Sequence, residues 1–247
     1  MGYKTMDANE AVSRVSYKFT EIAGIYPITP ASPMAEKVDV LASKGEINFW
    51  GNKVKVIEME SEKGAIATVH GALQAGVLAT TYTASQGLLL MIPSIYKMAG
   101  EMLPGVIHVA ARSLSTHSLS IFGDHQDIYA VRQTGACMLS SSSVEEAYHM
   151  AMVSHLASIK SSLPFINFFD GFRTSHEIDK VKEIDLSKLE TLIDKKALRK
   201  FRDNGMISGA TTRGTAENED VYFQHTESRN GYYTKAIDNV IYYMDKI

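Results

Sequence analysis

The segment VKVIEMESEKGAIATVHGALQAGVLATTYTA, residues 54–84, predicts a β-α-β unit. Val54–Ile57 has the apolar pattern of a strand, apolar residues recur at helical spacing through Ala65–Leu73, and a second apolar run covers Val77–Thr81. A crossover of this length returns the chain parallel to its first strand. Glu62 should therefore lie in the first helical turn, at the carboxyl edge of the sheet, where open α/β sheets bind ligands.

The same alternation of strand and helix continues on both sides of this unit. Apolar strand patterns cover 22–26, 105–111, 136–139 and 164–169, and helical patterns cover 7–21, 33–43, 85–102 with a kink at Pro93, and 143–160. We expect an α/β domain over 1–184, built on a doubly wound parallel sheet of five or six strands. A helical extension of the same domain is expected over 185–247, with helices at 187–202 and 231–247 joined by a polar loop at 204–220.

Composition favours a soluble protein that handles small molecules. The 247 residues are 45% hydrophobic and carry a formal net charge of −3, which gives no electrostatic reason to expect nucleic acid or membrane as a partner. The amino terminus lacks the apolar core of a signal peptide, so we expect a cytoplasmic location. Cys137 is the only cysteine in the sequence, and it cannot form an internal disulfide or hold an iron–sulfur cluster by itself.

Three polar residues follow three different predicted strands. Thr29 lies in the proline-rich loop PITPASP, Glu62 begins the central helix, and Arg112 follows the strand GVIHVAA. On a parallel sheet these positions can converge, and such side chains can respectively bond a carbonyl oxygen, pair with a ring nitrogen, and clamp a carboxylate. Each residue taken alone more often has an ordinary structural role, as a turn former, a helix-start carboxylate and a salt-bridge partner.

Other chemical motifs are weaker. The segment GDHQDIYAVRQTG places Asp124, His125, Asp127 and Arg132 close together, as a site or, in the interpretation we prefer, as a polar network that braces an interface. Asp-His-x-Asp alone is a weak metal signal. The chain has no Walker loop, no Gly-x-Gly-x-x-Gly after the first strand and no Gly-x-Ser-x-Gly elbow.

A series of ordered motifs resembles the amino-terminal domain of pyruvate:ferredoxin (or flavodoxin) oxidoreductases, and the resemblance covers nearly the whole chain. The motifs are YPITPASPMAE at 26–36, SEKGA at 61–65, HGALQAG at 70–76, TASQGLLLMIP at 83–93, HVAARS at 108–113, SIFGDHQD at 120–127, FFDGFRTSHE at 168–177 and RGTAEN at 213–218.

The resemblance implies a thiamine diphosphate-binding fold, with this chain as the domain that holds the pyrimidine. Glu62 would bond N1′ of the pyrimidine, while Thr29 and Arg112 would contact pyruvate. Lys63, beside Glu62, departs from the small residue that other members carry. The full enzyme would convert pyruvate and coenzyme A to acetyl-CoA and CO₂ as a homodimer, with ferredoxin or flavodoxin as electron acceptor.

The resemblance also implies that the diphosphate, its Mg²⁺ and the iron–sulfur clusters are held by parts of the enzyme outside these residues. We therefore expect the 247 residues alone to be inactive. Two alternatives stay open. One is a relative that uses another 2-oxoacid, and the other is a non-catalytic α/β assembly module in which Thr29, Glu62 and Arg112 are ordinary caps and salt-bridge partners.

Overall fold

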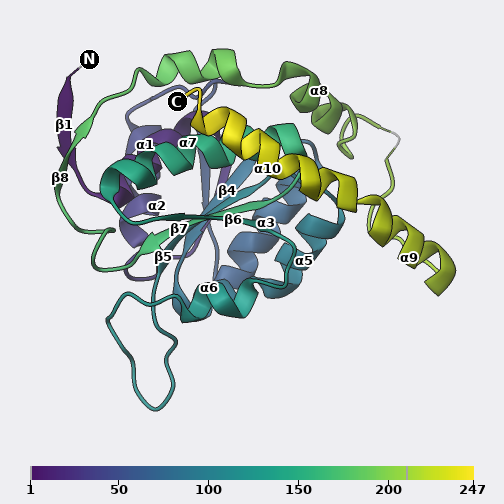
Figure 1. The fold of residues 1–247 in the computed structure, drawn as a ribbon, viewed down its shortest axis with the longest axis horizontal. Coiled ribbons are helices and arrows are strands. Elements are labelled where there is room, and N and C mark those ends of the chain that lie inside the picture. The colour runs from purple at the N-terminus through teal and green to yellow at the C-terminus, as the bar shows by residue number, and fades with distance from the viewer. Residues whose placement is uncertain (1, 210) are drawn as a thin grey trace.

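The computed structural model describes residues 2–209 and 211–247, and a six-stranded parallel sheet lies at its centre (Figure 1). The strand order is β3-β2-β4-β5-β7-β6. The predicted doubly wound parallel α/β fold is confirmed. The strands are β2 (Ile22–Ile25), β3 (Lys55–Glu58), β4 (Ala79–Thr83), β5 (Val106–Ala111), β6 (Cys137–Ser141) and β7 (Phe165–Asp170).

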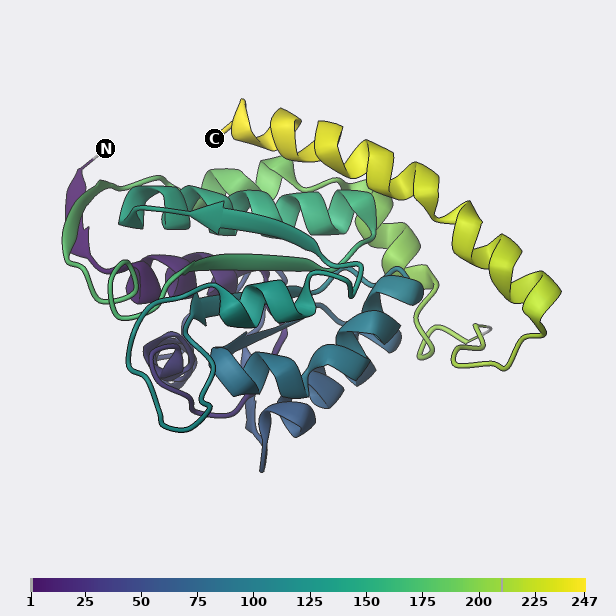
Figure 2. The ribbon, with the colours of Figure 1, turned by 60° about the horizontal axis from the view of Figure 1, so that its bottom comes forward.

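Helices cover both faces of the sheet, as Figure 2 shows. One face carries α1 (Ala8–Phe19), α2 (Ser32–Ser43) and α7 (Val144–Ser161), and α1 packs against both of the other helices. The other face carries α3 (Glu62–Gln74), α4 (Ser85–Leu90), α5 (Ile92–Gly100) and α6 (Gln126–Val131). Strands β4, β5 and β7 lie between these layers. Because helices cover β5 on both faces, its side chains are buried along its whole length.

Two helix boundaries differ from the sequence prediction. The predicted helix over 85–102 is two helices, α4 and α5, which meet at Met91. Pro93 lies in the first turn of α5, where a backbone N–H would have no partner within the helix, so proline is tolerated there. The helix predicted over 33–43 begins one residue earlier, because Ser32 already belongs to α2 and the cap is Ala31. The helix predicted over 7–21 is α1, and Asp7 caps it by accepting a hydrogen bond from the backbone N–H of Glu10.

The segment after residue 178 contains more structure than the sequence indicated. Strand β8 (Asp179–Lys182) pairs antiparallel with β1 (Tyr3–Met6), and the predicted helix at 187–202 is divided into a 3₁₀ helix, η1 (Leu186–Leu192), and α8 (Lys195–Asp203). Helix α9 (Glu219–Ser228) begins inside the expected connection and has no buried residue.

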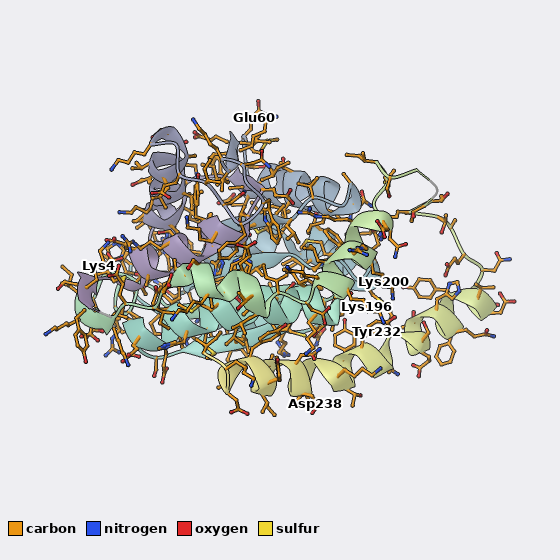
Figure 3. The ribbon with its side chains drawn as sticks, turned by 90° about the horizontal axis from the view of Figure 1, so that it is seen from above. Lys4, Glu60, Lys196, Lys200, Tyr232 and Asp238 are labelled. Atoms are coloured by element: carbon orange, nitrogen blue, oxygen red, sulfur yellow. The ribbon has the colours of Figure 1, made fainter. Side chains whose placement is uncertain are left out.

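Helix α10 (Asn230–Met244) forms an outer layer over α7. Figure 3 shows Lys196 and Lys200 of α8 beside Tyr232 of α10, where these two helices line one pocket. Among the described residues, no helix has the combined length and apolarity needed to cross a membrane.

A pair of buried histidines bridges the sheet and the α1–α7 layer. The Nε2 atoms of His108 on β5 and His155 on α7 lie 3.1 Å apart, and Asn167 Nδ2 donates to His108 Nδ1 at 3.1 Å. The His155 ring stacks on Phe19 with centroids 4.9 Å apart. Burial lowers the pKa of His155 to about 3, and burial together with His155 lowers the pKa of His108 well below its usual value. Both rings are therefore neutral in the folded protein at neutral pH.

This pair predicts a specific pH dependence of stability. Below a pH of about 6.5 the unfolded chain binds protons that the folded chain does not, so each buried histidine lowers the free energy of unfolding by about 1.4 kcal/mol per pH unit. For His155 this loss continues down to a pH of about 3. The free energy of unfolding, measured with denaturant at several pH values between 6.5 and 4, should fall less steeply with decreasing pH for His155→Gln than for the unsubstituted chain. The exposed His117, changed to Gln, is the control and should leave the slope unchanged; equal slopes for all three proteins would contradict the prediction.

Candidate active site

The carboxyl ends of the parallel strands meet at one edge of the sheet, and all three predicted site residues lie there. Thr29 follows β2, Glu62 follows β3, and Arg112 follows β5. Strand β2 lies between β3 and β4 in the sheet. The chain therefore runs from β2 to β3 on one side and then crosses back over β2 to form β4 on the other side. Ligands of doubly wound sheets bind at such a reversal of strand order. The fold therefore places the candidate residues at the edge where a ligand is expected.

Arg112 and Thr29 contact each other directly. Nη1 of the Arg112 guanidinium donates to the backbone carbonyl of Thr29 at 2.9 Å, and Nε donates to the carbonyl of Ser120 at 3.0 Å. The Arg112 side chain is buried, whereas Thr29 is exposed. Nη2 has no hydrogen-bond partner among the residues that the structure describes. One face of the guanidinium is thus fixed by the protein, and Nη2 with the second hydrogen of Nη1 can still bind a carboxylate in a bidentate manner.

The proline-rich loop that carries Thr29 is held from two further sides. Asn9 of α1 donates through Nδ2 to the carbonyl of Pro30 at 3.1 Å. Gly171, just after β7, lies against the Pro30 ring so closely that an added Cβ would stand 2.6 Å from Pro30 Cγ. These contacts fix the position of the loop, so the exposed hydroxyl of Thr29 is presented from a rigid support.

Asp127 of α6 joins the ends of two strands. Its Oδ2 accepts from the backbone N–H of Ser85 at 2.8 Å and from that of Arg112 at 3.0 Å, while Oδ1 accepts from Ile128 N at 2.8 Å. Asp127 is fully buried, and this burial raises the pKa of its carboxyl, although the three hydrogen bonds oppose the shift. The carboxylate therefore sets the backbone position from which Arg112 reaches the site.

Ser85 takes a conformation that is rare for a residue with a side chain. Its φ of 50° lies in the left-handed region, at the turn from β4 into α4. The side-chain Oγ donates to the carbonyl of Ser113 at 2.8 Å, and the N–H bonds to Asp127. Strained backbone held by such contacts is common at functional sites. Here it directs the start of α4 toward Glu62.

Glu62 is the first residue of α3, and the helix start is well capped. Ser61 accepts from the backbone N–H of Gly64 at 3.2 Å, which places Glu62 at the positive end of the helix. The Glu62 side chain is 7% exposed, yet its carboxylate accepts no hydrogen bond from any residue that the structure describes. Lys63 is exposed and makes no ion pair with Glu62 within the described residues. A buried carboxylate without a donor is available to a ligand.

Close packing of α4 determines where the Glu62 carboxylate lies. A Cβ added to Gly87 would stand 2.7 Å from Glu62 Cγ, 2.8 Å from Glu62 Oε1 and 2.6 Å from Thr83 Oγ1. Only glycine permits this approach of the helix to the two side chains. The structure thus brings Glu62 together with Thr83 and Gly87, and it brings Arg112 together with Thr29, in neighbouring parts of the same edge.

The four residues of the GDHQDIYAVRQTG segment do not form one cluster. Asp127 points inward, whereas Asp124 Oδ1 accepts from Gln126 N and His125 Nε2 bonds Asp170 Oδ1 at 2.8 Å. Arg132, at the carboxyl-terminal cap of α6, donates to the carbonyl of Tyr129. Within residues 2–209 and 211–247 no group of three His, Cys, Asp or Glu side chains is arranged to hold a metal ion. The segment contacts the edge of the sheet through Asp127, which bonds the backbone of Ser85 and Arg112. Its proposed role at an interface stays a prediction.

Three residues that build the site were not singled out as site residues from the sequence. Thr83 and Gly87 lie in the motif TASQG, which begins at the last residue of a strand, and this position is the signal that could have drawn attention to them. The sequence shows Asp127 as an acid near His125, but its partners are backbone N–H groups of distant segments. Hydrogen bonds to backbone leave no residue-type pattern that a sequence can show.

The arrangement offers a ligand two different recognition elements. Glu62 supplies a carboxylate that can accept from a protonated ring nitrogen or an amine, and Arg112 with Thr29 supplies donors for an anionic oxygen compound. A heterocycle beside a small organic acid fits this set of groups. The observation that supports the fit is the buried Glu62 carboxylate, to which no described residue donates.

Comparisons with known proteins give a consistent picture. A family model described as pyruvate flavodoxin/ferredoxin oxidoreductase, thiamine diP-bdg, matches residues 14–245. The chain is 56% identical over 245 residues to the pyruvate-flavodoxin oxidoreductase of Klebsiella pneumoniae, with 99% of the chain and 21% of the relative covered. It is 52% identical over 248 residues to the pyruvate:ferredoxin oxidoreductase of Moorella thermoacetica, with 100% of the chain and 21% of the relative covered.

A solved structure supports the fold. The 2-oxoglutarate:ferredoxin oxidoreductase of Magnetococcus marinus, with 2-oxoglutarate, coenzyme A and succinyl-CoA bound, superposes with a TM-score of 0.66 at 22% identity, over 76% of this chain and 32% of that one. The chain spans about a fifth of the length of the two curated relatives.

Proposed function

We propose, because the chain belongs to the pyruvate flavodoxin/ferredoxin oxidoreductase family through its thiamine diphosphate-binding domain, that it holds the pyrimidine of the cofactor in an enzyme that oxidises pyruvate. The buried Glu62 carboxylate at the carboxyl edge of the sheet, to which no described residue donates, is the observation that carries the proposal. In this proposal residues 1–184 are the cofactor domain and 185–247 its helical extension.

Glu62 acts on the cofactor and not on the substrate. Thiamine diphosphate, when bound, supplies an acidic ring carbon that adds to the carbonyl of a 2-oxoacid and stabilises the charge left by loss of CO₂. The Glu62 carboxylate would hold a proton at N1′ of the pyrimidine and so would favour the tautomer in which the 4′-nitrogen is a base. Burial strengthens this interaction, since few water molecules compete for the carboxylate.

Arg112 and Thr29 would position the 2-oxoacid. The Arg112 hydrogens that the protein leaves unbonded match the two oxygens of a carboxylate, and the hydroxyl of Thr29 can donate to the keto oxygen as negative charge develops on it. The Arg112–Thr29 bond of 2.9 Å fixes the relative position of the two groups before substrate binds. Such preorganisation reduces the cost of orienting the acid for reaction.

The remaining parts of the reaction would be carried outside these residues. We propose coenzyme A as acetyl acceptor and ferredoxin or flavodoxin as electron acceptor, in a cytoplasmic homodimer. The names of the two relatives support the electron acceptors, and the 21% of each relative that the chain covers leaves room for segments that hold the diphosphate, Mg²⁺ and iron–sulfur clusters. The 247 residues alone are expected to be inactive.

An assay with two substrates tests the proposal. The longer polypeptide that contains this chain, supplied with thiamine diphosphate, Mg²⁺ and coenzyme A, should reduce a viologen dye with pyruvate and much more slowly with 2-oxoglutarate. The 247-residue chain should give no reduction. Faster dye reduction with another 2-oxoacid would identify that acid, and not pyruvate, as the substrate. The absence of cofactor-dependent reduction with any 2-oxoacid would favour the assembly-module alternative.

Replacing Arg112 by Lys should raise the KM for pyruvate and lower kcat in the longer polypeptide. Lysine keeps the positive charge but has a single nitrogen, so it cannot bond Thr29 and Ser120 as Arg112 does and also present a planar donor pair to a carboxylate. The loss of one bidentate pair should lower kcat/KM by roughly tenfold to a hundredfold. Arg132→Lys, on the exposed side of α6, is the matched control and should leave the kinetics unchanged. Altered thermal stability of Arg112→Lys with unchanged kinetics would assign Arg112 a structural role only.

A further inference from the structure

The threonines on one side of β4 have hydroxyl groups that the fold does not use. Side chains alternate along a strand, and Thr80 and Tyr82 face α1, where they bond Thr20 and Ser16 at 2.8 and 2.7 Å. Thr81 and Thr83 face the opposite layer. Both are fully buried, and neither Oγ1 has a hydrogen-bond partner among the described residues. A buried hydroxyl without a partner costs free energy, so its presence needs an explanation.

Thr83 differs from Thr81 in what lies beside it. An added Cβ at Gly87 would meet Thr83 Oγ1 at 2.6 Å and Glu62 Oε1 at 2.8 Å, so the two oxygens face the same point above Gly87. The Thr83 hydroxyl is a donor, and the Glu62 carboxylate is an acceptor that no described residue satisfies. Because Gly87 has no Cβ, the point that both oxygens border is not filled by a side chain of that residue.

We propose that Thr83 is a positioning residue, whose hydroxyl donates to Oε1 of Glu62 when a pyrimidine is bound and so leaves Oε2 facing the ring nitrogen. The inference rests on the proposed function, in which Glu62 pairs with N1′. The bond fixes the rotation of the carboxylate and favours its ionised form. Thr83 itself is too deeply buried to contact the ligand.

The role of Thr83 can be separated from simple packing by comparing two ligands. In the longer polypeptide, calorimetry would give the Kd of thiamine diphosphate with Mg²⁺, and the Kd of an analogue in which CH replaces N1′. Thr83→Val keeps the shape and removes the donor, and it should weaken binding of the cofactor by about tenfold to a hundredfold, the effect of a hydrogen bond to a charged group. Binding of the analogue should stay at the wild-type value, because the analogue makes no bond that depends on Glu62.

Two further variants serve as controls. Thr83→Ser keeps the hydroxyl and should restore cofactor binding, and Thr81→Val removes the equivalent buried hydroxyl two positions away and should change neither Kd. The Tm of ligand-free Thr83→Val should equal or exceed that of the wild type, since valine removes an unpaired polar group from a strand.

The possible failures are distinguishable. Thr83→Val with wild-type affinity for both ligands, or with equal losses for both, would overturn the inference. If Glu62→Gln abolishes the preference for the cofactor over the analogue while Thr83→Val does not, the proposed function stands and the role of Thr83 is wrong. If Glu62→Gln also leaves that preference unchanged, the proposed function itself fails.

Discussion

Glu62→Gln is expected to lower pyruvate oxidation by the longer polypeptide about 10²–10⁴-fold, the range in which positioned acid–base groups contribute. The amide has the shape of the carboxylate but carries no charge, so it cannot hold a proton at N1′ of the pyrimidine. The fold should be preserved, because a first-turn glutamate stabilises its helix by only about 0.3–1 kcal/mol. Dye reduction and thermal unfolding, measured on the same preparation, check both parts.

A neighbouring glutamate provides the control. Glu60 lies two residues before Glu62, and Figure 3 shows it at the outer end of the loop into α3. Glu60 is exposed, so Glu60→Gln makes the same change of charge and shape near the site without touching the buried carboxylate. It should keep the activity of the unsubstituted enzyme. Wild-type turnover by Glu62→Gln, or an equal loss in Glu60→Gln, would contradict the role given to Glu62.

Asp127→Ala should lower the free energy of unfolding by about 3–5 kcal/mol, because the loss of its carboxylate leaves several buried donors unsatisfied at about 1–3 kcal/mol each. The variant leaves the buried N–H groups of Ser85 and Arg112 without an acceptor. It should also displace Arg112 from Thr29, so pyruvate oxidation should fall together with stability. Asp127→Asn should lower the free energy of unfolding by an intermediate amount. Its amide oxygen can still accept a hydrogen bond, but its NH₂ group is a donor that faces a backbone N–H donor.

Asp124→Ala is the control, because it measures the free energy of unfolding that is lost when an ordinary surface hydrogen bond near a helix start is removed. Asp124 lies three residues earlier and accepts from Gln126 N at 3.0 Å at the surface. Its removal should cost about 0.5–2 kcal/mol. Urea unfolding of the two variants should therefore differ clearly in midpoint. Similar midpoints would show that Asp127 is no more than a helix cap.

The six central strands could be predicted because each is an apolar run between turn residues, and a buried parallel sheet requires such runs. Strand β1, YKTM, lacks this signal, since only Met6 is buried and the strand is specified by its pairing with β8. Helix α9 lacks a buried face altogether, so its sequence shows no amphipathic period. Elements that contact little of the core leave little pattern in the sequence.

The positions of the candidate site residues could be predicted from the sequence, but their contacts could not. Thr29, Glu62 and Arg112 follow predicted strands, and topology alone brings such positions to one edge. The bond from Arg112 to the Thr29 carbonyl joins residues 83 positions apart, and the bond from Arg112 to Asp127 uses a backbone N–H. These contacts depend on rotamers and loop shape, which residue types do not encode locally.

The strand order has a consequence for the growing chain during translation. Strand β5, buried along its length, has β4 on one side and β7 on the other, whereas β6, which is synthesised before β7, pairs only with β7. Until β7 leaves the ribosome, β5 exposes an apolar edge and β6 has no neighbour. Open strand edges pair readily with other chains. Nascent chains stalled between β6 and β7 should therefore need chaperone protection more than those stalled beyond β7, and ribosome profiling of chaperone contacts would reveal it.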